Sequence, residues 1–197
     1  MNSLDIEAQI TSDPVVLNQA AGVIFPGVGA AGQAMNLLES RGLDYILRNL
    51  VAAQKPLLGI CLGCQILLEE SEEGPTRTLG ILSGRCRRFN PAWSDGDRPI
   101  RIPHMGWNSL RRSGEGKNAS RLLDGIAQNA QFYFVHSYYP QPDPALVIAT
   151  TTYGAEFTSI YGRPGLWAAQ FHPEKSGPPG LRLLANFYEY CRETANA

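Results

Sequence analysis

The sequence predicts an α/β protein built on a mixed, mainly parallel central sheet flanked by helices. Twice within the first 70 residues an uncharged apolar run leads into a glycine turn: residues 22–25 precede Pro-Gly-Val-Gly, and the run from Pro56 precedes Gly-Ile-Cys-Leu-Gly. A helix-like stretch lies between them. This alternation is typical of a parallel sheet. After Gly74 the sequence changes to short β-like runs between turns, which predict an antiparallel or mixed part of the same sheet.

Composition excludes several classes of protein. The 197 residues fit one domain with a single sizeable core, and the 44% hydrophobic content is ordinary for a globular protein. A net charge of −1 gives no indication of binding to nucleic acid or to an anionic membrane. We find no membrane-spanning run and no signal peptide. Four irregularly spaced cysteines indicate neither a disulfide framework nor a metal site, so we expect a cytoplasmic, reducing compartment.

The first elements are predicted from local patterns. Residues 4–10 alternate apolar and polar side chains, as in a half-buried strand. Asp13 and its neighbours can cap a short helix over residues 14–20, with Pro14 at its start. Apolar residues recur at helical spacing over residues 33–53, where Gly42 is expected to interrupt the helix.

The rest of the chain is predicted to form short strands and a closing helix. The polar residues 113–118 are expected to form an exposed loop. A helix is predicted from about Leu181 to Glu193, with an apolar face of Leu184, Phe187, Tyr190 and Cys191. Strands are predicted at residues 79–82, 86–89, 132–135, 147–152, 157–161 and 166–171.

Cys61 is the candidate nucleophile. It lies between Gly59 and Gly63, after a predicted strand and before an amphipathic run through residues 66–68. Flanking glycines allow a strained strand-to-helix turn that exposes the side chain at the carboxyl end of a sheet. At a helix N-terminus, unpaired amides and the helix dipole favour a thiolate. The alternative interpretation is a buried cysteine between two packing glycines.

His172 and Glu174 are the candidate base and its orienting group. They are separated by Pro173 at the end of a predicted strand, where positions i and i+2 project to the same side. A carboxylate there would fix the imidazole tautomer, raise its basicity and support a thiolate–imidazolium pair. The alternative is a solvated pair in a loop. We interpret His136 as a hydrogen-bonded strand histidine, and Cys64, Cys86 and Cys191 as inert packing thiols.

Besides a nucleophile and an oriented base, catalysis by a cysteine requires a site that stabilises an oxyanion. The turn Gly27, Val28 and Gly29 follows a strand and can point amides inward, and the amide of Leu62 would be the second donor. Taken alone, this turn is weak evidence. The arginines at positions 85, 87 and 88 are interpreted as a solvated face, with phosphate or partner contact as the alternative.

These residues together resemble the class I (triad) glutamine amidotransferases. Within that family, Pro-His-Met-Gly-Trp-Asn makes the chain most similar to the glutaminase subunits of imidazole glycerol phosphate synthase. The matching segments are residues 26–29, 59–65, 69–74, 103–108, 134–138 and 171–176.

The resemblance implies a mechanism and no cofactor. Cys61 would attack the side-chain amide of glutamine, His172 would act as acid and base, and Glu174 would orient His172. A glutamyl thioester would form, ammonia would leave, and water would release glutamate. The family analogy implies that the amino-acid end of the substrate is held by Gln65, Glu73, Ser137, Tyr138 and backbone near Gly29.

The resemblance also implies a partner, a (β/α)₈ cyclase that uses the ammonia in histidine biosynthesis. Its products would be imidazole glycerol phosphate and aminoimidazole carboxamide ribonucleotide. The residues implied to face this partner are His104, Met105, Gly106, Trp107, Asn108, Tyr133 and Lys175. Met and Trp are residue types enriched at interface centres, although packing into the core is the alternative.

The sequence departs from the family at its beginning. The family normally opens with a short strand, an Asp-Tyr-Gly turn and a helix, none of which precedes residues 5–10 here. We interpret the chain as an N-terminally shortened single domain over residues 1–197. Three other functions stay open: the glutaminase subunit of anthranilate or pyridoxal phosphate synthase, an inactive partner-binding subunit, and, less favoured, a cysteine peptidase.

Overall fold

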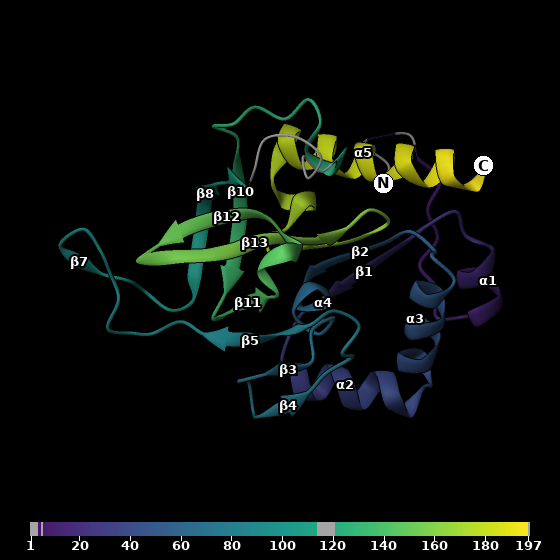
Figure 1. The fold of residues 1–197 in the computed structure, drawn as a ribbon, viewed down its shortest axis with the longest axis horizontal. Helices are drawn as coiled ribbons and strands as arrows, with labels where there is room; N and C mark the ends of the chain where they lie inside the picture. The colour runs from purple at the N-terminus through teal and green to yellow at the C-terminus, as the bar shows by residue number, and fades with distance from the viewer. Residues whose placement is uncertain (1–3, 5, 114–120, 197) are drawn as a thin grey trace.

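The main sheet has six strands and mixed directions (Figure 1). The computed structural model describes residues 4, 6–113 and 121–196. The first three neighbours in the sheet run parallel and the next three pair antiparallel, which confirms the predicted mixed α/β fold class. The expectation that the sheet is mainly parallel is wrong, because antiparallel pairings outnumber parallel ones among the described strands. In spatial order the strands are β1 (Val23–Gly27), β2 (Leu57–Cys61), β14 (Leu166–Ala169), β13 (Ala155–Arg163), β12 (Val147–Tyr153) and β9 (Arg111–Arg112).

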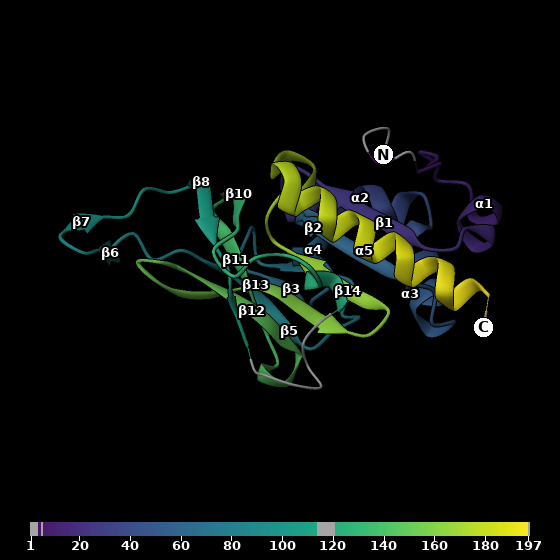
Figure 2. The same ribbon diagram turned by 90° about the horizontal axis from the view of Figure 1, so that it is seen from above.

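Helices cover both faces of the parallel part of this sheet. α5 (Gly177–Ala195) lies on one face, and α2 (Ala31–Ser40) and α3 (Leu43–Ala52) lie on the other (Figures 1 and 2). Successive side chains of a strand point to opposite faces. Leu57 therefore packs in the core beside α2 and α3, whereas Leu58 packs in the core beside α5.

Smaller sheets lie beside the main sheet. β8 (His104–Ser109) pairs antiparallel with β10 (Gln131–His136). β6 (Ser94–Asp95) and β7 (Arg98–Pro99) form a ribbon that projects from the body of the molecule in Figure 1. The remaining sheet consists, in spatial order, of β11 (Tyr138–Pro142), β5 (Gly84–Arg88), β3 (Glu70–Ser71) and β4 (Thr76–Arg77).

The helices follow their sequence signals closely. α1 (Pro14–Gln19) begins after Asp13, whose carboxylate accepts a hydrogen bond of 2.8 Å from the Val15 amide. Gly42 adopts a φ of 66° and separates α2 from α3, as predicted. The last helix begins at Gly177 rather than near Leu181, because a Pro pair at its first turn starts the helix.

Two predicted strands are wrong. Residues 6–13 have no regular structure, and Ile10 is fully exposed; an alternating pattern needs a neighbouring strand, and none of the described residues pairs with it. Residues 79–82, of which only Gly80 is exposed, form a loop, because the amides of Leu79 and Ile81 donate to the carbonyls of Ile66 and Leu67.

Two further points concern the described part of the chain. Its helices include none that combines the length and the apolar character needed to cross a bilayer. The loop expected at residues 113–118 falls, apart from Ser113, outside the described residues.

Candidate active site

Cys61 lies at a sharp turn between β2 and α4 (Leu62–Gln65). Its φ of 54° and ψ of −112° are strained for a residue with a side chain, as expected at a strand-to-helix elbow. The turn is closely packed, since a Cβ atom on Gly63 would lie 2.0 Å from the carbonyl oxygen of Phe25. The predicted amphipathic helix is shorter than expected: it ends at Gln65, and the next three residues are all buried.

A cavity of about 370 Å³ opens beside Cys61. Residues from the carboxyl ends of β1 and β2 meet there with β10, β11 and the turn after β14. Gly27 pairs with Cys61 in the register of β1 and β2, and Glu174 contacts His172. The predicted site residues on the cavity wall are Val28, Gly29, Cys61, Leu62, Gln65, Glu73, Ser137, Tyr138, His172 and Lys175.

His172 is placed between the thiol and a carboxylate. Its Nδ1 lies 2.7 Å from Oε1 of Glu174. The hydrogen bond with Cys61 and then that with Glu174 raise the pKa of His172 to about 9, against the opposing effect of burial. Partial burial of Glu174 opposes its ionisation, but the hydrogen bond from His172 holds its pKa below the ordinary value. This arrangement favours an imidazolium beside the thiol.

The contact between His172 and Glu174 arises differently from the prediction. β14 ends at Ala169, and Pro173 starts a 3₁₀ turn, Pro173–Lys175. The carboxylate of Glu174 thus reaches the ring of His172 because the backbone makes a tight turn, and not because the two residues share one side of a strand. Proline at the start of a helical turn sacrifices no hydrogen bond, because the first amides have no internal partner.

Ser176 holds this turn against the neighbouring sheet, a role that the sequence did not reveal. Its buried hydroxyl donates to the carbonyl of His172 at 2.6 Å and accepts from the amide of Tyr133 at 3.0 Å. The amide of His172 also donates to the carbonyl of Tyr133 at 2.9 Å. The base is therefore linked to Tyr133 of β10 twice, directly through its backbone amide and through Ser176 at its backbone carbonyl.

Gln65, at the end of α4, and Glu73, in the acidic run that follows, both line the cavity. Glu73 Oε2 accepts a hydrogen bond of 2.7 Å from the amide of Ala31, at the start of α2, whose preceding residue offers no side-chain cap. Gln65 Nε2 donates to the carbonyl of Tyr138 at 2.9 Å and to Oε1 of Gln170 at 2.9 Å. Both polar side chains are thus fixed by hydrogen bonds where they line the cavity.

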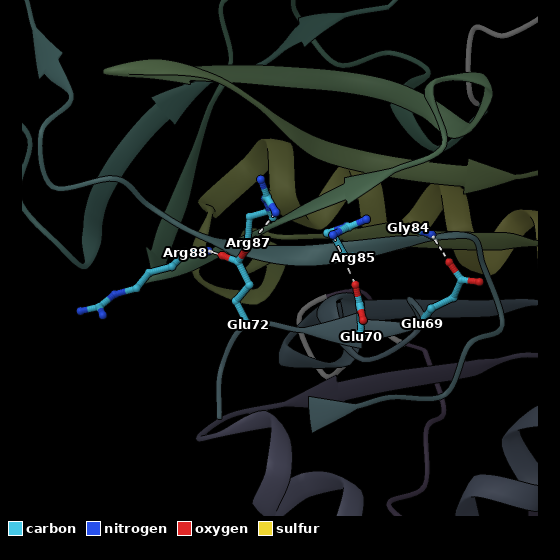
Figure 3. Close-up of polar contacts among 7 residues, drawn as sticks. All are labelled: Glu69, Glu70, Glu72, Gly84, Arg85, Arg87 and Arg88. Atoms are coloured by element: carbon cyan, nitrogen blue, oxygen red, sulfur yellow. Dashed lines mark hydrogen bonds and ion pairs between the residues drawn. The ribbon is translucent and has the colours of Figure 1, made fainter. Parts of the chain in front are cut away.

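The acidic run that leads to Glu73 is held against β5, as Figure 3 shows. Glu72 accepts from the amide of Arg88 at 2.8 Å and pairs with the guanidinium of Arg87 at 2.9 Å. Arg85 pairs with Glu70 at 3.5 Å. The basic strand is therefore largely neutralised by its neighbour, which supports its interpretation as a solvated face.

The residues expected to face a partner are divided by the alternation of β8. Met105 and Trp107 are 62% and 52% exposed, and the Trp107 ring packs edge-on against Tyr133 at 5.9 Å. His104 is 3% exposed, so its expected place on a partner surface is wrong: its ring is stacked in the core. Asn108 donates to the carbonyl of Thr152, and Gly106 is half-buried.

The other cysteines behave as packing groups, as predicted. Cys64, Cys86 and Cys191 are buried free thiols. Burial raises the pKa of each, to about 11 for Cys191, so the neutral thiol dominates.

The sequence matches the model of the family described as glutamine amidotransferase class-I over residues 2–191. The chain belongs to the class-I glutamine amidotransferases. A protein of Nitratidesulfovibrio vulgaris named imidazole glycerol phosphate synthase subunit HisH is 62% identical, over 100% of this chain and 91% of the relative. A protein of the same name from Maridesulfovibrio salexigens is 58% identical, over 100% of this chain and 92% of the relative.

Solved structures agree with this family assignment at the level of the fold. A protein of Thermoplasma acidophilum described as a GMP synthase subunit has a TM-score of 0.68 at 15% identity, over 99% of this chain and 86% of that one. A structure described as glutamine amidotransferase has a TM-score of 0.67 at 23% identity, over 96% of this chain and 89% of that one. The mixed sheet with helices on both faces is thus the class-I amidotransferase fold.

Proposed function

We propose that this class-I amidotransferase is the glutaminase subunit of imidazole glycerol phosphate synthase. The observation that carries the proposal is the 62% identity to a HisH protein across the whole chain. The cavity supports it, because a cysteine at a strained turn faces a histidine hydrogen-bonded to a carboxylate. Free thiols at all four cysteines are consistent with a reducing compartment such as the cytoplasm.

The reaction follows from the placement of these groups. Cys61 attacks the side-chain carbonyl carbon of glutamine, and its proton resides on His172. His172 gives that proton to the departing nitrogen, which leaves as ammonia, while Cys61 keeps the glutamyl group as a thioester. Water then loses a proton to His172 and attacks the thioester. Glutamate leaves, and the proton returns to the sulfur.

Other groups assist these steps. Amides of Gly27, Val28 and Gly29 and that of Leu62 stabilise the oxyanion. Gly27 lies opposite Cys61 in the register of β1 and β2, and the other three residues line the same cavity as Cys61. Gln65 and Glu73 hold the amino-acid end of glutamine together with backbone at Ser137 and Tyr138. The ammonia passes to a (β/α)₈ cyclase subunit, which makes imidazole glycerol phosphate and aminoimidazole carboxamide ribonucleotide.

The test is reconstitution with a cyclase subunit. We expect the pair to convert glutamine to glutamate and to form imidazole glycerol phosphate, and Cys61→Ala to abolish both. Ammonium salts should restore product formation to the Cys61→Ala complex, because only the nitrogen supply is lost. Co-purification with an anthranilate or pyridoxal phosphate synthase instead of the cyclase would contradict the assignment, as would an inert unaltered complex.

A further inference from the structure

A chain of buried hydrogen bonds runs from the core to the wall of the cavity. Nδ1 of His104 lies 3.1 Å from Nε2 of His136, and Nδ1 of His136 lies 2.7 Å from the carbonyl oxygen of Tyr138. The same carbonyl accepts from Gln65, which also donates to Gln170. The four residues whose side chains form this hydrogen-bond network are at most 6% exposed: His104, His136, Gln65 and Gln170. Buried polar groups in such networks are costly to leave unpaired.

The hydrogen bonds of the two histidines have a fixed direction. A carbonyl oxygen can only accept, so Nδ1 of His136 carries a proton and donates it to Tyr138. Nε2 of His136 is then the acceptor, and Nδ1 of His104 must be the donor. Burial lowers the pKa of His104 to about 4 and that of His136 to about 3, so both rings stay neutral and keep these tautomers near neutral pH.

The orientation of the Gln65 amide is fixed in the same way. Its Nε2 donates one hydrogen to the carbonyl of Tyr138 and the other to Oε1 of Gln170. Both hydrogens are used, so the only polar group that Gln65 has left is the acceptor Oε1. Gln65 is a wall residue of the cavity, whereas His104 and Gln170 are not.

We propose that this chain of hydrogen bonds holds Gln65 with its oxygen toward the cavity, where the oxygen selects substrates that carry an α-ammonium group. His104 and Gln170 are then positioning residues that act through Gln65. The inference rests on the proposed glutaminase function, in which Gln65 already holds the amino-acid end of glutamine, and it adds the positioning role of His104 and Gln170. An ammonium group is only a donor, so an amide turned the other way would repel it.

The competing explanation is that His104 and Gln170 only fill the core. The His104 ring is sandwiched between Phe134 at 4.9 Å and Tyr153 at 4.1 Å, so it packs well without any hydrogen bond. His104→Phe keeps a ring in this sandwich but removes the donor. His104→Asn restores a donor close to the position of Nδ1, and Gln170→Met removes the acceptor for Gln65 with little change in volume.

The experiment compares two substrates in the complex with the cyclase subunit. One is L-glutamine and the other is 4-carbamoylbutanoate, which is glutamine without its α-ammonium group. We expect Gln170→Met and His104→Phe to raise KM for L-glutamine roughly 2- to 12-fold, the value of one neutral hydrogen bond, with kcat little changed. KM for 4-carbamoylbutanoate should stay constant, and His104→Asn should behave like the unaltered protein.

The outcomes distinguish failure of the proposed glutaminase function from failure of the positioning role. An unaltered complex without glutaminase activity would overturn the proposed function. With normal activity in that complex, equal changes in KM for both substrates, a fall in kcat alone, or no change at all would overturn the positioning role. Should Gln170→Met fail to fold, as measured by thermal unfolding, the pair His104→Phe and His104→Asn decides the matter.

Discussion

At the scale of single residues, the chemistry depends on where one proton resides. His172 contacts Cys61 on one side and Glu174 on the other, and these contacts raise its pKa to about 9. Because the folded-state pKa exceeds the ordinary value of about 6.5, the proton is bound more tightly in the folded protein. The resulting stabilisation is fully present below pH 6.5 and is lost as the pH rises through 9.

Glu174→Gln should therefore change the pH profile of glutamine hydrolysis. The imidazolium that donates to the leaving ammonia is present up to about pH 9 in the unaltered protein, so activity should fall above that pH. Without the carboxylate, the pKa of His172 falls and the alkaline loss of activity should begin at lower pH. We also expect kcat to fall roughly 10²-fold at neutral pH. The measurement is kcat and kcat/KM against pH in the complex.

Glu70→Gln is the matched control for that prediction. Glu70 is an exposed carboxylate paired with Arg85 on β5, and it is not among the cavity-lining residues (Figure 3). Its removal should leave the alkaline limb in place. An alkaline limb that is identical in Glu174→Gln and the unaltered protein would show that the carboxylate does not hold the proton on His172.

At the scale of elements, the elbow depends on close approach between β1, β2 and α4. Gly63→Ala would place a Cβ 2.0 Å from the carbonyl oxygen of Phe25, which is backbone and cannot rotate away. We expect a loss of about 3 kcal/mol in the free energy of unfolding, together with lower glutaminase activity because Cys61 shifts. Urea denaturation and a glutamate-release assay measure the two effects.

Gly32→Ala provides the contrast. Gly32 is in α2, and the nearest atom to an added Cβ is the Thr76 hydroxyl at 3.3 Å, which needs to shift only slightly to accept it. Alanine in a helix is favoured over glycine by about 0.5–1 kcal/mol, so this variant should be as stable as the unaltered protein or more stable. Equal losses in both glycine variants would argue against a specific packing requirement at the elbow.

Elements whose signals are local were predictable. The capped start of α1 and the break at Gly42 need only neighbouring residues to be recognised. β8 was missed because its pattern is inverted: His104 is buried and Gly106 and Asn108 are half-buried, whereas Met105 and Trp107 are exposed. A polar inner face and an apolar outer face do not resemble a half-buried strand.

The site was predictable to the extent that it rests on motifs. Cys61 and His172 occur in recognisable segments, and the structure brings both to one cavity. The pairing of His104 with His136 depends on the register of β8 against β10, in which these two residues lie opposite each other. Register between segments so distant in sequence is set by tertiary packing, so no local pattern could have indicated it.

At the scale of the whole molecule, the cavity is continuous with the surface formed by Tyr133 and Trp107. β1 and β2 end at the cavity, and the turn after β14 brings His172 there, at the carboxyl edge of the parallel strands where α/β folds bind ligands. Lys175 lines the cavity and also lies over the Tyr133 ring at 6.0 Å, and Tyr133 in turn contacts Trp107. A partner bound to this surface would therefore adjoin the site where ammonia is released.

This continuity predicts that Trp107→Ala weakens the complex without damaging the fold. The side chain is 52% exposed, so its removal should leave thermal unfolding nearly unchanged. As the centre of an interface it should contribute roughly 2 kcal/mol, which corresponds to about a 30-fold rise in Kd for the cyclase subunit by titration calorimetry. Tyr45→Ala is the control, because this 67% exposed aromatic residue is on α3 and is not a cavity residue. Similar Kd values for the two variants would place the interface on another face, since loss of a buried anchor must cost more than loss of a solvent-exposed ring.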